Sequence, residues 1–152
     1  MSDNGRQPVI VCAEDDADDR MLVQDAFGEA GMGNFLKFVE DGEQLIDYLL
    51  HRNGFTTDNA PYPDVILLDL NMPRKDGREA LGEIKRNSAL RRIPVVVLTT
   101  SKAGEDVSNS YELGASGFIT KPVSYEGLVD AAKTLRKYWF ELGKLPFVRN
   151  GS

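Results

Sequence analysis

Short apolar runs alternate with amphipathic segments along almost the whole chain, and this alternation constrains the fold more strongly than any other feature of the sequence. The apolar runs have the length and the β-branched content of buried strands. Apolar residues recur at helical spacing after them, as Leu22, Ala26 and Ala30 do after the first run. Such alternation favours right-handed crossovers and one parallel sheet with helices on both faces. We therefore predict an α/β, doubly wound fold.

The limits of the elements follow from where these patterns start and stop. The expected strands cover residues 8–13, 35–39, 65–69, 93–99 and 117–120. The expected helices cover residues 17–30, 41–50, 77–86, 103–113 and 124–142. Asp41 is expected to cap the second helix, with Gln44 in the capping-box position three residues later. Gly114 is expected to end a helix in the left-handed conformation, and residues 53–63 are expected to form a surface loop.

The length of the chain predicts one domain. A chain of 152 residues can bury one full core. We expect a flexible N-terminus over residues 1–7, the folded domain over 8–142 and a C-terminal extension over 143–152. Too few residues follow Leu142 to fold a second domain.

Composition excludes several classes of partner. The net charge is −6 with both signs interspersed, which disfavours a nucleic-acid or anionic-membrane surface. No apolar run is long enough to span a bilayer, and residues 1–7 lack the apolar segment of a secretory signal. The single cysteine, Cys12, lies in an apolar run, where we expect a buried core residue. These features together predict a cytoplasmic location.

The carboxyl ends of the expected strands carry the residues that point to chemistry. Strand 65–69 is apolar until it ends in Asp69, and a carboxylate there is costly unless a cation or hydrogen bonds compensate its charge. Ligands of doubly wound sheets bind beyond these strand ends. The other strands end in Glu14-Asp15-Asp16, Thr99-Thr100-Ser101 and Thr120-Lys121-Pro122.

These residue types together favour phosphoryl transfer to a carboxylate. Converging carboxylates repel one another unless a hard divalent cation binds between them, and oxygen ligands favour Mg²⁺. Lys121 supplies a further positive charge, and Thr99 supplies a hydroxyl donor. An aspartate nucleophile beside such groups suits the transfer, because the cations neutralise charge on the transferring group.

The chain resembles the receiver domain of two-component response regulators. The resemblance covers roughly residues 8–142 and depends on motifs that occur in order at the strand ends. The motifs are Glu14-Asp15-Asp16, Asp69-Leu70-Asn71-Met72-Pro73 with Asp76-Gly77, Leu98-Thr99, and Gly114-Ala115-Ser116-Gly117-Phe118 leading into Lys121-Pro122. It implies a flavodoxin-like (βα)5 fold whose five-stranded parallel sheet has the order 2-1-3-4-5.

The resemblance also implies a phosphoacceptor and a metal site. Asp69 would accept a phosphoryl group from the phosphohistidine of a sensor histidine kinase. Asp15, Asp69 and the main-chain carbonyl of Asn71 would bind Mg²⁺, for which Mn²⁺ can substitute. Glu14 would act through a metal-bound water, and it replaces the commoner Asp of the family. Asp16 follows this pair and is expected to be peripheral.

The remaining motif residues are implied to report phosphorylation. Lys121 would pair with the phosphoryl oxygens. Thr99 would hydrogen-bond the phosphoryl group after transfer, and Phe118 would turn inward with it. Phe118 stands where a Tyr is also common, so the ring is kept and the hydroxyl is lost. The change would be displayed on the surface formed by the fourth helix, the fifth strand and the last helix.

A narrower resemblance concerns the single-domain regulators that are paired with bacterial phytochromes. It depends on the loop before residue 65, the segment 92–101 and the C-terminal tail. It implies a phytochrome-type kinase and a homodimer. The aromatic residues of the tail are candidates for that interface, and they are Trp139, Phe140 and Phe147.

Simpler roles exist for each of these residues alone. An acidic residue after a strand often caps the next helix, and a threonine in a strand is common. His51 has no second histidine nearby and is expected to be a surface residue. Only the combination of Asp15, Asp69, Thr99 and Lys121 favours an active site.

Two other functions compete with phosphoacceptance. A receiver-fold adaptor that works without phosphorylation usually lacks an acidic or lysine position, and none is missing here. An aspartyl-nucleophile phosphatase needs a second acid two residues after the nucleophile, where this chain has Asn71. A flavin protein of similar topology would meet repulsion between its phosphate and the carboxylates after the first strand. We therefore expect a signalling protein that catalyses only its own phosphotransfer and autodephosphorylation. Its output is expected to come from protein contacts, reverse phosphotransfer or sequestration of phosphoryl groups.

Overall fold

The structure is a computed structural model that describes residues 8–70, 72, 75–100, 114–121 and 124–142. At residues 34, 99, 100, 118–121 and 138–142 the description covers the backbone alone.

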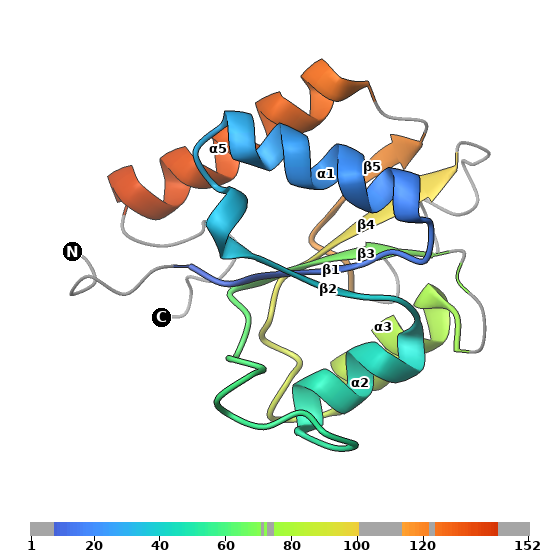
Figure 1. The fold of residues 1–152 in the computed structure, drawn as a ribbon. Coiled ribbons are helices and arrows are strands. Elements are labelled where there is room, and N and C mark those ends of the chain that lie inside the picture. The colour runs from blue at the N-terminus through green and yellow to red at the C-terminus, as the bar shows by residue number, and fades with distance from the viewer. Residues whose placement is uncertain (1–7, 71, 73–74, 101–113, 122–123, 143–152) are drawn as a thin grey trace.

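Five parallel strands form one twisted sheet through the middle of the molecule (Figure 1). Their order is β2-β1-β3-β4-β5, which confirms the predicted fold class. The strands are β1 (Ile10–Ala13), β2 (Leu36–Val39), β3 (Val65–Asp69), β4 (Val95–Thr100) and β5 (Gly117–Lys121). The order changes direction between β1 and β3, so the carboxyl ends of these two strands flank the place where such sheets bind ligands.

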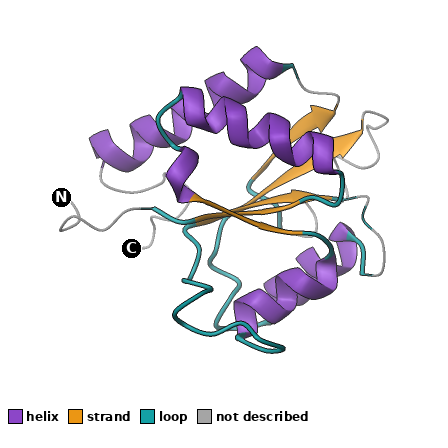
Figure 2. Ribbon diagram, viewed as in Figure 1, coloured by secondary structure: helices purple, strands orange, loops and turns teal. Residues whose placement is uncertain are grey.

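Helices cover both faces of the sheet (Figures 1 and 2). One face carries α1 (Ala17–Glu29) and α5 (Tyr125–Leu142), and the other carries α2 (Gly42–Leu50) and α3 (Gly77–Arg86). A short 3₁₀ helix, η1 (Gly33–Phe35), precedes β2. The predicted helix over 103–113 lies outside the described residues. Gly114, which was expected to follow it, has the predicted left-handed backbone with φ +106°.

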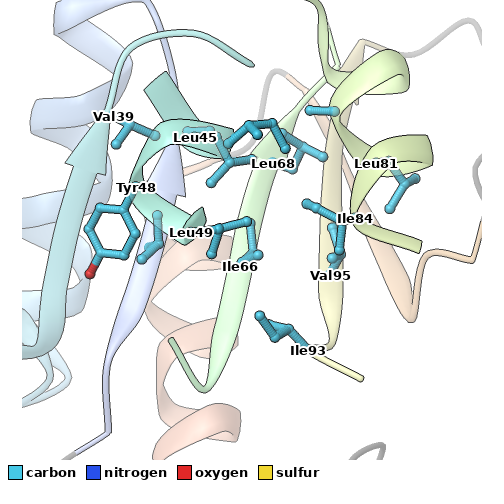
Figure 3. Close-up of a cluster of buried hydrophobic side chains, with 14 of the residues drawn as sticks. Val39, Leu45, Tyr48, Leu49, Ile66, Leu68, Leu81, Ile84, Ile93 and Val95 are labelled. Atoms are coloured by element: carbon cyan, nitrogen blue, oxygen red, sulfur yellow. The ribbon is translucent and has the colours of Figure 1, made fainter. Parts of the chain in front are cut away.

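The alternation of side chains along the strands divides the core into two layers. In β1, Val11 and Ala13 belong to the layer under α2 and α3, whereas Ile10 and Cys12 belong to the layer under α1 and α5. Cys12 is fully buried, as predicted. Figure 3 shows the first layer, in which leucine and isoleucine side chains from α2 and α3 meet those of β3. Every residue of β3 is buried, so the strand that ends in Asp69 is central to both layers.

The predicted limits differ from the structure mainly where strands begin. β4 starts at Val95 rather than at residue 93, because Pro94 has no N–H and the N–H of Ile93 bonds to the carbonyl of Leu90 instead. The predicted ends of β3 and α3 are those observed. The Asp41 side chain accepts from the N–H of Gln44 (2.8 Å), as predicted. The reciprocal bond is different, since Gln44 accepts from the N–H of Glu40 (2.9 Å).

Tyrosine and histidine side chains bond to carbonyl groups of the loops at the amino edge, which is the end of the sheet where the strands begin. Tyr48 donates to the carbonyl of Pro61, and Tyr62 donates to that of Ala89, both at 2.8 Å. Burial raises the pKa of the Tyr48 hydroxyl to about 12. The predicted surface histidine, His51, is exposed, but its Nε2 also lies 2.8 Å from the carbonyl oxygen of Ala60. The 53–63 segment is thus a surface loop that side-chain hydrogen bonds hold in place.

Two hydrogen bonds join the starts of β1 and β3 at this same edge. The N–H of Val9 donates to Oδ2 of Asp64, and the N–H of Asp64 donates to the carbonyl of Val9, both at 2.8 Å. The pair sets the register in which Ile10 lies opposite Val65. Within the described residues, no helix is both long and apolar enough to cross a membrane.

Candidate functional site

Three carboxylates meet at the carboxyl edge of the sheet, beyond β1 and β3. The two strands pair with Ala13 opposite Leu68, so the next residues, Glu14 and Asp69, are neighbours. One oxygen of each of Glu14, Asp15 and Asp69 lies within 4.8 Å of the others. Glu14 is 1% exposed and Asp69 is 2% exposed, whereas Asp15 faces solvent. The structure therefore brings together the three acidic residues that the sequence predicted as one site; we call them the carboxylate triad.

Glu14 is held in this position by bonds to three different segments. Its N–H donates to the carbonyl of Val39 at 3.0 Å, which extends the pairing of β1 with β2 by one residue. Its carboxylate Oε2 accepts from the N–H of Asp16 at 3.2 Å. Its carbonyl oxygen accepts from the guanidinium of Arg20 at 2.8 Å. The sequence did not single out Arg20, because nothing in the order of residues shows that the first turn of α1 folds back onto Glu14.

Asp16 has a structural role beside the triad. Its side chain Oδ1 accepts from the N–H groups of Asp18 (2.8 Å) and Asp19 (3.0 Å), so it caps α1. Capping satisfies donors that the first turn of a helix leaves unpaired. Asp16 therefore has the simpler role of an acidic residue after a strand, which is to cap the next helix. Glu14 and Asp69, in contrast, are buried within the triad.

The main chain on either side of Asp69 leaves no room for a side chain at Gly77. The N–H of Leu70 bonds to the carbonyl of Leu98, and the N–H of Gly77 bonds to the carbonyl of Leu70, both at 3.0 Å. A Cβ at position 77 would lie 2.3 Å from the carbonyl oxygen of Asp69 and 2.5 Å from Cα of Leu70. Glycine at this position thus lets α3 start directly against the phosphoacceptor candidate.

A second close approach ties the loop after β3 to α2. The N–H of Gly42 bonds to the carbonyl of Lys75 at 2.9 Å, and a Cβ at position 42 would lie 2.2 Å from that oxygen. Lys75 also forms an ion pair with Glu83 of α3, and the hydrogen bond to this carboxylate raises the pKa of Lys75. The sequence did not single out Gly42 or Lys75. The only signal for this contact was a glycine, Gly42, at the start of a helix.

The remaining site residues are placed by the backbone alone. Asp69 lies opposite Leu98 in the sheet, Thr99 follows Leu98 at the end of β4, and Lys121 pairs with Thr100 at the end of β5. The ends of β4 and β5 lie at the same carboxyl edge of the sheet as the end of β3, as predicted. Three other predicted residues lie on β5 and α5, with side chains outside the described part of the structure: Phe118, Trp139 and Phe140. Two lie outside the described residues altogether: Asn71 and Phe147.

The donor set of the triad fits a hard divalent cation. All three candidate ligands offer carboxylate oxygens, and neither sulfur nor imidazole is among them. Such oxygens favour Mg²⁺, Ca²⁺ or Mn²⁺ over softer metals. Two buried carboxylates at this separation repel each other in a medium of low dielectric constant, and a cation between them removes this repulsion.

Comparisons with known proteins identify the family to which this fold belongs. Residues 10–133 match the family described as the response regulator receiver domain. Response regulator Rcp1 from Synechocystis sp. is 41% identical over 147 residues, which cover 96% of this chain and 99% of Rcp1. The crystal structure of the Mn²⁺-bound form of Rcp1 superposes with a TM-score of 0.76 over 92% of this chain and 99% of that one.

Two further crystal structures are also similar over nearly the whole chain. Response regulator RPA3017, in red light signalling of R. palustris, is 35% identical with a TM-score of 0.82, covering 92% of this chain and 99% of its own. The phosphorylated cyanobacterial phytochrome response regulator RcpA is 38% identical with a TM-score of 0.79, covering 93% of this chain and 99% of its own. The chain described here belongs to the response regulator receiver domain family.

Proposed function

We propose that this protein is a single-domain response regulator that accepts a phosphoryl group on Asp69 from a sensor histidine kinase, in a reaction that depends on Mg²⁺ and tolerates Mn²⁺. Response regulator receiver domains are signalling proteins rather than classical enzymes. The observation that carries the proposal is the carboxylate triad, in which oxygens of Glu14, Asp15 and Asp69 lie within 4.8 Å of one another while two of the three residues are buried.

In this proposal Glu14, Asp15 and Asp69 hold the cation, together with the main-chain carbonyl of Asn71. When bound, the metal ion would neutralise negative charge on the transferring phosphoryl group. The Mn²⁺-bound form of Rcp1 supports a divalent cation in this family. Glu14 is a glutamate in place of the commoner aspartate, and in this proposal it acts through a metal-bound water molecule.

The chemical step is an in-line displacement at phosphorus. A carboxylate oxygen of Asp69 forms a bond to phosphorus, and the bond from phosphorus to the imidazole nitrogen of the donor histidine breaks. The ammonium of Lys121 pairs with the phosphoryl oxygens, and the hydroxyl of Thr99 donates to one of them after transfer. The sheet order supports these two roles, because β4 pairs with β3 and β5 pairs with β4, so the ends of all three strands lie side by side at the carboxyl edge.

The output in this proposal is a conformational change that the phosphoryl group triggers. Thr99 moves towards the new charge and Phe118 turns inward with it, which changes the surface formed by the predicted helix 103–113, β5 and α5. The phosphoryl group is later lost by hydrolysis at the same site. Both residues lie on adjacent paired strands, β4 and β5, so a movement at one can be transmitted to the other.

The kinase in this proposal is of the phytochrome type. Support comes from RcpA, described as a phytochrome response regulator, and from RPA3017, described as acting in red light signalling. The receiver domain covers residues 8–142 and works in the cytoplasm as a homodimer, to which Trp139, Phe140 and Phe147 contribute. Residues 1–7 and 143–152, which were expected to flank this domain, lie outside the described residues.

Phosphotransfer to the Asp69→Asn variant tests the assignment of the acceptor. With a phosphorylated histidine kinase and Mg²⁺, the wild-type protein should take up labelled phosphoryl groups and the variant should not. Asp16→Asn is the matched control, because Asp16 neighbours the triad but caps α1. Labelling of Asp69→Asn at the wild-type rate would refute the proposal.

Metal binding separates this function from a phosphorylation-independent adaptor. Mg²⁺ binding to the wild-type protein is expected to be measurable by calorimetry and to weaken by about tenfold in Asp15→Ala, because one charged ligand is lost. An adaptor has no need of the metal, so equal binding to both proteins, or to neither, would favour that alternative.

A further inference from the structure

Arg20 connects the two loops that border the carboxylate triad. It lies in the first turn of α1, where its N–H bonds to the carbonyl of Asp16 at 3.0 Å. Its Nη1 donates to the carbonyl oxygen of Glu14 at 2.8 Å, and its Nη2 lies 4.0 Å from Oε2 of Glu40. The side chain is 24% exposed, so most of it is covered by the protein. The guanidinium thereby spans the loop after β1 and the loop after β2.

The bond to Glu14 acts on two candidate metal ligands at once. The carbonyl of Glu14 belongs to the peptide group that joins Glu14 to Asp15, so fixing this oxygen fixes the plane from which both side chains leave the backbone. The N–H of Glu14 is already bonded to Val39, and its carboxylate accepts from Asp16. With Arg20 in place, all three polar parts of Glu14 have a partner, and the direction of its side chain is determined.

The charge of Arg20 and its position have opposite effects on a bound cation. A positive charge beside a cation site repels the cation, so removing this charge alone would strengthen binding. A side chain that holds ligands in place strengthens binding, so its removal weakens the site. The direction of the change in an Arg20 variant therefore distinguishes the two effects.

The size of the cation adds a second distinction. Mg²⁺ requires nearly octahedral ligands at about 2.0–2.1 Å, whereas Ca²⁺ accepts flexible geometry at about 2.3–2.6 Å. Loosening the peptide between Glu14 and Asp15 should thus harm Mg²⁺ binding more than Ca²⁺ binding. A change in charge, or a general loss of structure, should alter the affinity for both ions by similar factors.

From these contacts we infer that Arg20 is a positioning residue that makes the triad selective for Mg²⁺ over Ca²⁺. The inference rests on the proposed metal site and assigns to that site a determinant outside its ligands. Arg20 does not contact the metal in this account; it acts through the carbonyl oxygen of Glu14.

The decisive experiment measures Mg²⁺ and Ca²⁺ dissociation constants of Arg20→Met by calorimetry, well below the unfolding temperature. Methionine keeps an unbranched side chain of similar reach and removes the charge and every donor. We expect the Mg²⁺ affinity to fall by about tenfold, at the low end of the losses seen when the partner of a metal ligand is removed. The Ca²⁺ affinity should fall by much less. The inference would be overturned if the ratio of Mg²⁺ to Ca²⁺ affinity stayed at the wild-type value, whether the two affinities both rise, both fall or stay constant.

Arg20→Lys keeps the charge and one donor but cannot contact Glu14 and Glu40 with one planar group. Its selectivity should lie between those of the wild-type protein and Arg20→Met, and it carries the test if Arg20→Met fails to fold. A ratio of Mg²⁺ to Ca²⁺ affinity below that of Arg20→Met would contradict the assignment. If Arg20→Met cannot be measured, a ratio in Arg20→Lys equal to that of the wild-type protein would contradict it.

Two control variants isolate the bond to Glu14. Glu40→Gln removes the distal contact, which is long and involves a side chain that is 63% exposed, so both affinities should stay within about twofold. Arg52→Met removes a guanidinium paired with Asp47 at the other end of α2, and it should leave selectivity unchanged.

If Asp15→Ala binds Mg²⁺ as well as the wild-type protein does, the proposed function itself fails. If Asp15→Ala loses Mg²⁺ affinity but Arg20→Met keeps the wild-type selectivity, only this inference fails.

Discussion

At the amino edge of the sheet, two tyrosines and a histidine satisfy the carbonyls of the loops, whereas at the carboxyl edge three carboxylates gather beyond β1 and β3. The donors of the amino edge stabilise the fold, since each bond satisfies a carbonyl that would otherwise lose its partner. The buried carboxylates repel each other, and a bound cation would remove this repulsion. The same sheet therefore has one edge that favours stability and another in which stability is given up for chemistry.

The largest effect is expected where backbone meets backbone at the carboxyl edge. Gly77→Ala places a Cβ against the carbonyl of Asp69, and neither backbone segment can move without disturbing the strand. The free energy of unfolding should fall by about 3 kcal/mol, the upper end of ordinary overpacking costs. Equilibrium unfolding in urea measures it.

Gly28→Ala is the control for this substitution. Gly28 lies in α1 with nothing within 4 Å of the added Cβ, so alanine should raise the free energy of unfolding by about 0.5 kcal/mol through helix propensity alone. Similar losses in both variants would show that the close approach at Gly77 is not the cause.

Neutralising one carboxylate at each edge should give effects of opposite sign. In the presence of a chelator, Asp69→Asn should raise the free energy of unfolding by about 2 kcal/mol, because one of two buried charges is removed. Asp64→Asn should lower it by about 1 kcal/mol, because the charge-assisted bond from the N–H of Val9 is weakened. Millimolar Mg²⁺ should reduce the gain in Asp69→Asn, since only the wild-type site binds the ion tightly. Two changes of the same sign would remove the contrast between the edges.

Tyr48→Phe should cost stability without any cost to function. Loss of the bond to Pro61 should lower the free energy of unfolding by about 1 kcal/mol at neutral pH. The pKa of Tyr48 is raised from 10.0 to about 12 by burial, so the neutral hydroxyl is favoured in the folded state. This stabilisation is complete below the unfolded pKa and is lost as the pH rises through the folded one.

The difference between wild type and Tyr48→Phe should therefore vanish between pH 10 and 11, and by pH 11, where ionisation of Tyr48 alone costs the wild-type protein about 1.4 kcal/mol, the variant should be slightly the more stable of the two. Urea unfolding at neutral pH and at pH 11 measures it. Phosphotransfer and Mg²⁺ affinity should stay at wild-type levels in the variant, and a loss of either would show that the amino edge also serves the site.

The smallest effect tests a carboxylate of the carboxyl edge that is not part of the triad. Asp16→Ala removes the cap of α1 and should lower the free energy of unfolding by about 1 kcal/mol or less. Its Mg²⁺ affinity, measured by calorimetry, should stay within about threefold of the wild-type value. A tenfold loss would place Asp16 among the metal ligands and widen the site.

Sequence patterns were sufficient for the sheet because apolar periodicity is a local property. The limits of β3 and α3 were predicted from Val65–Asp69 and Gly77–Arg86 alone, and the strand-end rule brought Glu14, Asp15 and Asp69 together. The contacts that support the site were not predictable in this way. Arg20 bonds to a carbonyl six residues earlier, and Gly42 meets Lys75 across two loops. The Arg20 contact depends on the start of α1 folding back towards β1. The Gly42 contact depends on how two segments that are distant along the chain approach each other in space.

The bonds between Val9 and Asp64 also bear on the order in which the chain can fold during synthesis. β1 is made first, yet it lies inside the sheet, and its partner residues in one of its two neighbours, β3, come 55 positions later in the chain. Closing so long a loop has an entropic cost that must be met before β-pairing compensates it, which makes such pairing slow. Until β3 has been synthesised, β1 lacks one of its two neighbouring strands. A chain that stalls before residue 64 therefore leaves one edge of a buried strand unpaired, a condition that promotes aggregation.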